Sequence, residues 1–150
     1  MPLVQVLYVS SARPAVTADD VAEILASSRR RNMAAGVTGM LLYCGDNFLQ
    51  ILEGEEGPVD ETLRRIGRDS RHSNLQTLIR EAISSPAFGD WSMGFENLNA
   101  QSDDDPAAAF EIGRAEIERH LAARDAWRVR HFMETFYRIN TRRELSLRRA

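Results

Sequence analysis

"VTGMLLYCGDNFLQILEG", Val37 to Gly54, contains two apolar segments separated by a short turn sequence. "VTGMLLYC" and "NFLQILE" flank "GDN", a combination typical of a β-hairpin. Because successive positions are apolar in both segments, both faces of each strand should be covered in the folded protein. The stretch therefore predicts two inner strands of a sheet that has a layer of helices on each side.

Gln50 is the residue of this stretch that does not suit a buried strand. Alternate side chains of a strand point to opposite faces, so Gln50 shares its face with Phe48 and Leu52. A buried amide whose hydrogen-bonding groups are left unpaired costs about 1–3 kcal/mol. We therefore expect Gln50 to have a polar partner, either a neighbouring backbone group or a group lying on the same face.

Strand and helix patterns follow one another along the first hundred residues. "PLVQVLYVSS" predicts a strand, and Thr17 to Gly36 predicts a helix with Thr17 as N-cap and Gly36 as its stop. A second helix is expected from Gly57 and Pro58 to about Asp69, followed by strands at "LQTLIREAIS" and "WSMGFENL". This order predicts an α+β fold, a ferredoxin-like five-stranded mixed sheet with two helices on one face.

The remaining residues predict a helical extension. An acidic linker, "SDDDP", precedes a segment of helical periodicity that should break near Asp125 into two helices. We expect these helices to cover the other sheet face, giving a domain over residues 1–100 and an extension over 101–150. The aromatic stripe of Phe132, Phe136 and Tyr137 is larger than we expect one sheet face to bury, which predicts a homo-oligomer. The basic end, "TRRELSLRRA", could dock a partner protein, but a disordered, solvated tail is the expectation.

Composition limits the classes of function. The chain has 150 residues and a net charge of −3, so a general nucleic-acid binder is not expected. It has no apolar run of about 18 residues and one cysteine, Cys44, which favours a cytoplasmic protein without a membrane span. His72, His120 and His131 lack the mutual spacing of metal ligands, so no metal site is predicted.

Three polar residues are expected to meet on the helix-covered face. The first strand and the "NFLQILE" strand are the adjacent central pair of a ferredoxin-like sheet, so Tyr8 and Gln50 should be neighbours. Asn32, at the end of the first helix, should border the same space. The phenol can donate to the Gln50 amide, which in turn can bond a polar molecule between the two helices.

At this point the sequence resembles the BLUF domain family, the blue-light sensors that use flavin. The matching motifs are "LYVSSA", "ILASSRRRN", "GVTGMLLY", "FLQILEG", "RDSRH" and "WSMGF", in this order over roughly residues 3–98. The resemblance implies oxidised flavin between the two helices: FAD, with FMN or riboflavin as alternatives. The implied flavin-binding residues are Ile24, Leu25, Ser28, Arg31, Asn32, Phe48, Arg65, Ile66, Asp69 and Arg71.

The resemblance also implies a mechanism. Tyr8 would donate an electron and a proton to the excited flavin through Gln50, and the Gln50 amide would end in a new hydrogen-bond arrangement. Trp91 and Met93 would exchange places and carry the change to the C-terminal helices. The chain would then be a photoreceptor rather than an enzyme, signalling to an unidentified partner protein. Two alternatives are a flavin-free ferredoxin-like hydrolase and a light-independent flavin oxidoreductase.

Overall fold

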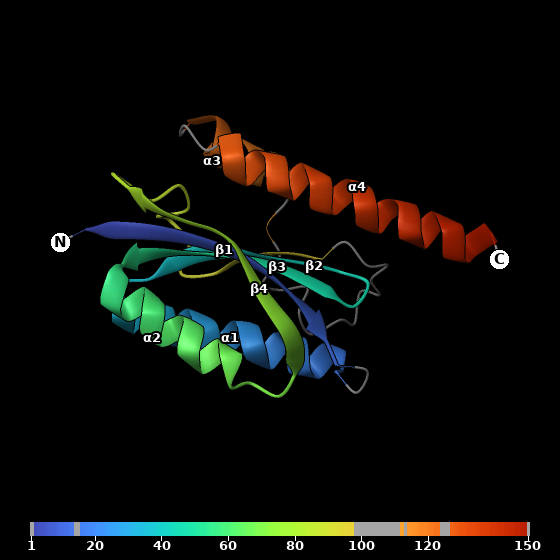
Figure 1. Cartoon of the computed structure of the whole chain (residues 1–150), viewed down its shortest axis with the longest axis horizontal. Coiled ribbons are helices and arrows are strands. Elements are labelled where there is room, and N and C mark those ends of the chain that lie inside the picture. Colours follow the sequence, from blue (N-terminus) through green and yellow to red (C-terminus); the bar gives the residue numbers. More distant parts are fainter. Residues whose placement is uncertain (1, 14–15, 98–111, 113, 124–126, 150) are drawn as a thin grey trace.

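A computed structural model of the chain describes residues 2–13, 16–97, 112, 114–123 and 127–149 (Figure 1). The helices Ala18–Ala35 and Glu56–Gly67 lie below the sheet in this view, and the helices Arg114–Ala123 and Trp127–Arg149 lie above it. The strands are β1 (Leu3–Ala12), β2 (Thr38–Cys44), β3 (Asn47–Glu55), β4 (His72–Ile83) and β5 (Gly94–Asn97). The helices are α1 (Ala18–Ala35), α2 (Glu56–Gly67), α3 (Arg114–Ala123) and α4 (Trp127–Arg149).

The five strands form one mixed sheet in the order β4-β1-β3-β2-β5. Neighbouring strands are antiparallel except for β2 and β5, which are parallel. The predicted ferredoxin-like arrangement with one added strand is confirmed. β1 and β3 are the central pair, and their register places Tyr8 directly opposite Gln50. The two residues that the sequence singled out are therefore neighbours.

Local sequence accounts for the ends of α1. Thr17 forms a capping box with Asp20, in which each side chain accepts a hydrogen bond from the other residue's backbone N–H. Gly36 ends the helix with φ of 70°, a left-handed conformation that glycine adopts without a steric penalty. The expected start and stop of this helix are confirmed.

Several expected boundaries need correction. β4 begins at His72 instead of Leu75, because residues 72 and 73 continue the pairing with β1. β5 is limited to Gly94–Asn97, where it pairs with β2, and Trp91 lies before it. α2 is Glu56–Gly67 and does not reach Asp69. The linker around 102–106 and the break near Asp125 lie outside the described residues.

The basic end of the chain was predicted incorrectly as a disordered tail. α4 continues as helix to Arg149. The segment from 141 to 149 contains no glycine or proline and is rich in Arg, Leu and Glu, which have high helix propensity. It therefore extends the helix that begins at Trp127.

The two sheet faces bury separate cores. On the face covered by α1 and α2, Val6, Leu41 and Leu52 pack with Val21 and Leu25. On the other face, strand residues pack against the C-terminal helices, confirming the second helical layer; this core includes Leu7, Met40, Leu42, Leu49, Ile51, Ile117, Leu121, Val129, Met133 and Phe136.

The aromatic stripe of α4 is largely absorbed by this second core. Phe136 is buried, and Phe132 and Tyr137 are partly buried against the cluster. One sheet face therefore accommodates the stripe, contrary to the argument that predicted a homo-oligomer. Within residues 127–139 of α4, where side-chain exposure is described, Trp127 and Ile139 are the large apolar side chains that remain exposed.

Candidate functional site

A pocket opens between the sheet and the helices α1 and α2. Its empty volume is about 690 Å³, which includes space open to solvent. β1 and β3 form its floor, and the two helices and the segment after α2 form its walls. The predicted site residues that line it are Tyr8, Ile24, Ser28, Arg31, Asn32, Phe48, Gln50, Arg65, Ile66, Asp69 and Arg71.

Three predicted site residues do not line this pocket. Leu25 is fully buried in the core beneath it, since that side of α1 faces the sheet. Met93 is also buried in this core, beside Gln50. Trp91 belongs to the opposite core, between the sheet and the C-terminal helices.

Sequence analysis missed five lining residues: Ser10, Ser27, Leu41, Thr62 and His72. His72 lies in the "RDSRH" motif, and its Nδ1 is 3.1 Å from Ser10 Oγ while its Nε2 is 2.6 Å from the Ile66 carbonyl oxygen. Ser10 is two positions after Tyr8, so strand alternation was the signal that could have found it. Small hydroxyl residues on helices give no comparable signal.

Gln50 and Tyr8 face the pocket side by side without bonding each other. The Gln50 Nε2 donates a hydrogen bond to Met93 Sδ at 3.4 Å, a weaker acceptor than the polar partner expected from the sequence. Among the described residues, the side chains of Tyr8 and Gln50 share no hydrogen bond. Burial and, secondarily, the negative charge of Asp69 raise the pKa of the Tyr8 phenol far above its usual value. Tyr8 therefore keeps its proton at neutral pH.

Asn32 links the pocket to the segment that precedes β5. Its Nδ2 donates to the Ser92 carbonyl oxygen at 2.7 Å, and Arg29 Nε donates to the Met93 carbonyl oxygen at 2.9 Å. Asn32 is almost fully buried, and its amide oxygen accepts no hydrogen bond within the described part of the chain. This oxygen is available to an N–H group of a ligand.

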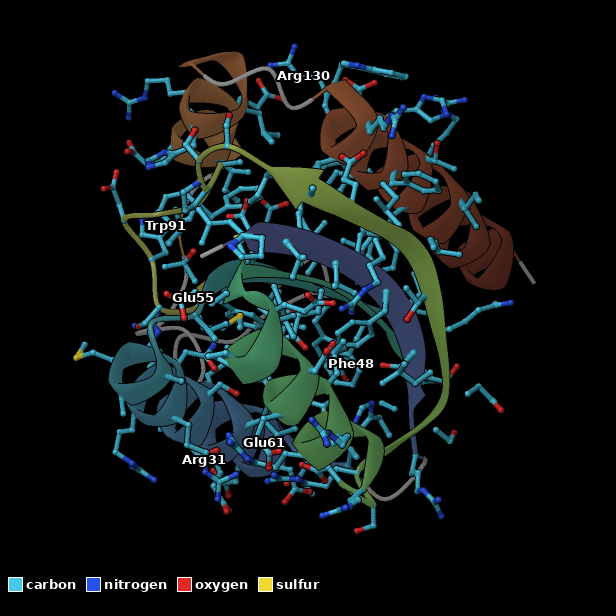
Figure 2. The ribbon with its side chains drawn as sticks, turned by 60° about the vertical axis from the view of Figure 1, so that its left-hand side comes forward. Arg31, Phe48, Glu55, Glu61, Trp91 and Arg130 are labelled. Atoms are coloured by element: carbon cyan, nitrogen blue, oxygen red, sulfur yellow. The ribbon has the colours of Figure 1, made fainter. Side chains whose placement is uncertain are left out.

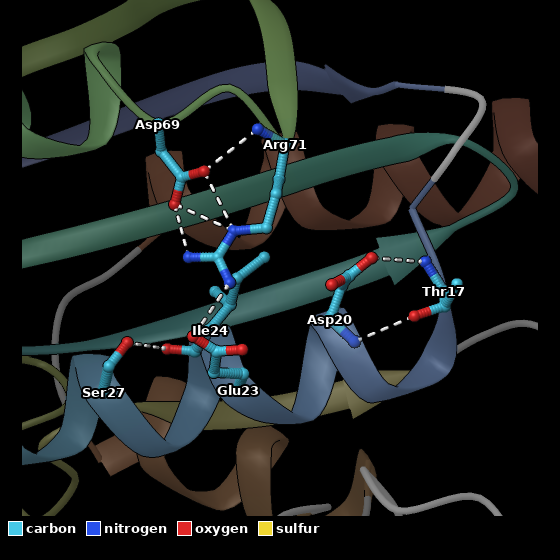
Figure 3. Close-up of polar contacts among 7 residues, drawn as sticks. All are labelled: Thr17, Asp20, Glu23, Ile24, Ser27, Asp69 and Arg71. Atoms are coloured by element: carbon cyan, nitrogen blue, oxygen red, sulfur yellow. Dashed lines mark hydrogen bonds and ion pairs between the residues drawn. The ribbon is translucent and has the colours of Figure 1, made fainter.

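Asp69 and Arg71 form a tight pair at the rim of the pocket (Figure 3). Arg71 Nη2 is 2.7 Å from Asp69 Oδ2, and Arg71 Nε is 2.9 Å from Asp69 Oδ1. Hydrogen bonding to Arg71 lowers the pKa of the Asp69 carboxyl below its usual value, against the opposing effect of burial. Glu23 of α1 approaches the same guanidinium at 3.7 Å. The pair is therefore charged at neutral pH and connects α1 with the segment after α2.

Glu53 is a buried carboxylate on the opposite face of the sheet. It accepts hydrogen bonds from the backbone N–H groups of Ala87 and Phe88, both at 2.8 Å, and from Gln5 Nε2 at 2.9 Å. The loop that it holds leads directly to Trp91. Sequence analysis did not identify Glu53, although a charged residue within an apolar strand is the same signal that marked Gln50.

The pocket residues fit a flavin. Ile24, Phe48 and Ile66 offer apolar surface to a flat ring, and Asn32 and Gln50 offer amides to its polar edge. Gln50, like Asn32, has an amide oxygen that accepts no hydrogen bond from any described residue. By contrast, no group of three His, Cys, Asp or Glu in the described ranges is suited to a metal ion. None of the described helices is long and apolar enough to cross a membrane.

Comparison with known proteins gives the same family throughout. The family model for sensors of blue light using FAD matches residues 3–94. The blue light- and temperature-regulated antirepressor BluF of Escherichia coli strain K12 is 32% identical over 117 residues, 77% of this chain and 29% of that protein. Photoactivated adenylate cyclase subunit alpha of Euglena gracilis is 31% identical over 87 residues, 58% of this chain and 8% of that protein.

Solved structures agree with the sequence matches. The dark-state structure of the BLUF protein BlrB has a TM-score of 0.65 and 36% identity, covering 81% of this chain and 96% of that chain. A bacterial light-regulated adenylyl cyclase has a TM-score of 0.64 and 29% identity, covering 81% of this chain and 36% of the cyclase. The chain thus spans less than a third of the curated relatives described above but nearly all of BlrB. The chain belongs to the BLUF family, the sensors of blue light using FAD.

Proposed function

We propose that this chain is a blue-light photoreceptor in which Tyr8 and Gln50 form a light-switched hydrogen-bond network with a bound flavin. The observation that carries the proposal is that Tyr8 and Gln50 are register partners on the pocket floor, and that Gln50 bonds Met93 of the segment leading to β5. A change at Gln50 would therefore alter a contact that extends beyond the pocket.

When bound and excited by blue light, a flavin supplies a strong oxidant at the pocket floor. Tyr8 would be the donor of one electron and of its phenol proton, and the Gln50 amide would conduct the proton. Both would return to Tyr8 as the charges recombine, which would leave Gln50 rotated or tautomerised. In that arrangement its Nε2 no longer donates to Met93 Sδ, so the side chains of the 91–93 segment become free to rearrange.

The proposed cofactor is FAD, with FMN and riboflavin as alternatives. Arg31 of α1 and Arg65 of α2 line the pocket from opposite walls, and neither forms an ion pair with any described residue. Two such guanidinium groups favour a phosphorylated flavin over riboflavin, because arginine binds phosphate through charge-assisted hydrogen bonds. Chromatography of the flavin released from the purified protein tests this, and riboflavin alone would contradict it.

The proposed output is a contact with an unidentified partner protein in the cytoplasm. The C-terminal helices are the element through which the change would leave the domain, because they pack on the sheet face to which Trp91 belongs. Association of the chain with itself also remains a prediction. A nucleic-acid partner is not proposed, in keeping with the net charge of −3.

The test is the colour of the purified protein and its response to light. We expect a yellow protein whose flavin absorption shifts reversibly to longer wavelength under blue light, without bleaching, and returns in the dark. A flavin-free hydrolase would be colourless and would take up no added flavin. A light-independent oxidoreductase would be yellow but would bleach with a reducing substrate and show no such shift.

A further inference from the structure

Trp91 is held outside the flavin pocket by a stack of rings. Its ring centroid lies 5.9 Å from that of Phe88 and 4.0 Å from that of His120, with interplanar angles of 25° and 34°. Phe88 and Trp91 belong to the segment before β5, whereas His120 belongs to α3. Figure 2 shows Trp91 on this segment, at the side of the sheet where α3 lies. The indole therefore makes a direct contact between the sensor domain and the C-terminal helices.

His120 has a hydrogen-bond acceptor at each ring nitrogen. Nδ1 lies 3.0 Å from the backbone carbonyl oxygen of Glu116, and Nε2 lies 3.1 Å from Asp90 Oδ2. Neither a carbonyl oxygen nor a carboxylate can donate, so both bonds require an N–H on the imidazole. A neutral imidazole has one N–H and the imidazolium has two. The arrangement is thus satisfied completely only when His120 is protonated.

A protonated His120 would also be attracted to Trp91 itself. A cation within about 6 Å of an indole centroid is stabilised by the negative face of the ring. Among the described residues, the charged groups that approach the imidazole are Asp90 on the loop before Trp91 and the Glu116 carboxylate on α3, 3.8 Å from Nδ1. Glu116 is itself paired with Arg119 of the same helix. The His120 side chain is only 15% exposed.

We propose that protonated His120 is a positioning residue that holds Trp91 outside the pocket in the dark, leaving the inner place beside Gln50 to Met93. This inference rests on the proposed light switch, because it names the contact that Trp91 must break when the 91–93 segment rearranges. The loss of that contact frees a face of α3. His120 would thereby couple the state of the pocket to the C-terminal helices, with a strength that depends on pH.

The direction of the pH effect follows from the charge. Histidine gains its proton as the pH falls through the range of about 8 to 5, so the contact with Trp91 is strongest at the acidic end. An exposed cation–π contact changes an equilibrium by about two- to fivefold. We expect return to the dark state to be faster at the acidic end by at most this factor, since the contact is restored during recovery.

The experiment uses the full-length, flavin-loaded chain carrying Trp127→Phe, which leaves Trp91 as its one tryptophan. Trp127 is 65% exposed, so this change should not disturb the core. Trp91 emission and dark recovery are measured from about pH 8 to about pH 5. His120→Gln is added to remove the charge, and His131→Gln, at an exposed position of α4, serves as the matched control.

A protonated imidazole quenches a neighbouring indole, so Trp91 emission should fall on acidification in the reference protein and in His131→Gln. In His120→Gln, Trp91 emission should no longer fall on acidification, and the rate of dark recovery should no longer depend on pH. Emission that is independent of pH in the reference protein, or that falls equally in His120→Gln, would overturn the inference. Absence of a light-induced flavin shift would instead refute the proposed function, and the dark emission would still report on the contact.

Discussion

The two faces of the sheet are built from the same strands but differ in what they leave between sheet and helices. Under α1 and α2, polar residues such as Gln50 and Asn32 surround a pocket. Under α3 and α4, apolar side chains from strands and helices form a closed core. Phe48 and Leu49 show the difference most simply, since adjacent residues of β3 belong to opposite faces. One face is shaped to hold a ligand, and the other is completed by the chain itself.

In the proposed photoreceptor, this difference would separate sensing from transmission. The pocket face can rearrange polar contacts when a ligand changes, because its packing is incomplete without the ligand. On the closed face, a shift of one side chain would displace its neighbours, because the core is densely packed. Trp91 and Met93, two residues apart, lie in the closed core and beside the pocket respectively. The segment that carries them is the physical link between the two faces.

Leu49→Ala and Phe48→Ala should show the largest contrast between the two faces, because the first should lower stability and the second should lower flavin affinity. Leu49→Ala leaves a cavity in the closed core and should lower the free energy of unfolding by about 2–5 kcal/mol while flavin affinity is retained. Phe48→Ala removes part of the pocket wall and should weaken flavin binding about ten- to a hundredfold. Urea unfolding and flavin titration check the pair. If the single variant Leu49→Ala also lost flavin affinity, the two faces would not have the separate roles described here.

Glu53→Gln tests the polar exception within the closed face. The amide retains one acceptor oxygen, so one of the backbone N–H groups of Ala87 and Phe88 should lose its partner. We expect a loss of about 1–3 kcal/mol in the free energy of unfolding. Glu55→Gln, two residues later and exposed, is the matched control and should have little effect. Equal losses in the two variants would show that the loop does not depend on Glu53.

Asn32→Ala should weaken flavin binding by roughly 5- to 150-fold, because a buried polar partner worth about 1–3 kcal/mol is removed. Met33→Ala is the control, since Met33 is the next residue of α1 and is 75% exposed. Flavin retention during dialysis provides the measurement. If Asn32→Ala holds flavin as firmly as the control does, Asn32 does not contact the ring.

Asp69→Asn should have the smallest effect. Because Arg71 lowers the pKa of Asp69 in the folded protein, the pair stabilises the fold above the unfolded pKa of about 3.9 and loses this contribution as the pH falls. In flavin-free protein, Asp69→Asn should cost about 0.2–1 kcal/mol near pH 6 and less near pH 3. Urea unfolding at the two pH values measures this. An equal cost at both would indicate lost packing instead of lost charge.

Much of the fold could be predicted because it depends on local patterns. Apolar runs on both sides of a turn gave the central hairpin, and Thr17 and Gly36 marked the ends of α1. Strand alternation placed Tyr8 and Gln50 on one face, and their pairing followed from the order of the strands. The pocket residues from α1 and the segment after α2 were likewise found, mainly through the family resemblance.

The sequence did not predict which of two similar apolar side chains occupies a given place in the pocket or the core. Trp91 and Met93 are both apolar and two residues apart, so strand alternation placed them together and did not reveal which one reaches Gln50. The choice depends on tertiary partners: Gln50 for Met93, and His120 for Trp91. Leu25 was expected in the pocket for a similar reason, since one turn of helix separates lining positions from core positions. Such choices are made by packing among distant segments.

Light-induced difference spectra of Gln50→Ala test the central claim most directly. The reference protein should show a reversible shift of flavin absorption to longer wavelength, because a hydrogen bond to the flavin carbonyl becomes stronger. Gln50→Ala should retain flavin but show no shift, and Tyr8→Phe, which keeps the ring and loses the phenol proton, should behave alike. A shift in Gln50→Ala equal to that of the reference protein would contradict the hydrogen-bond switch.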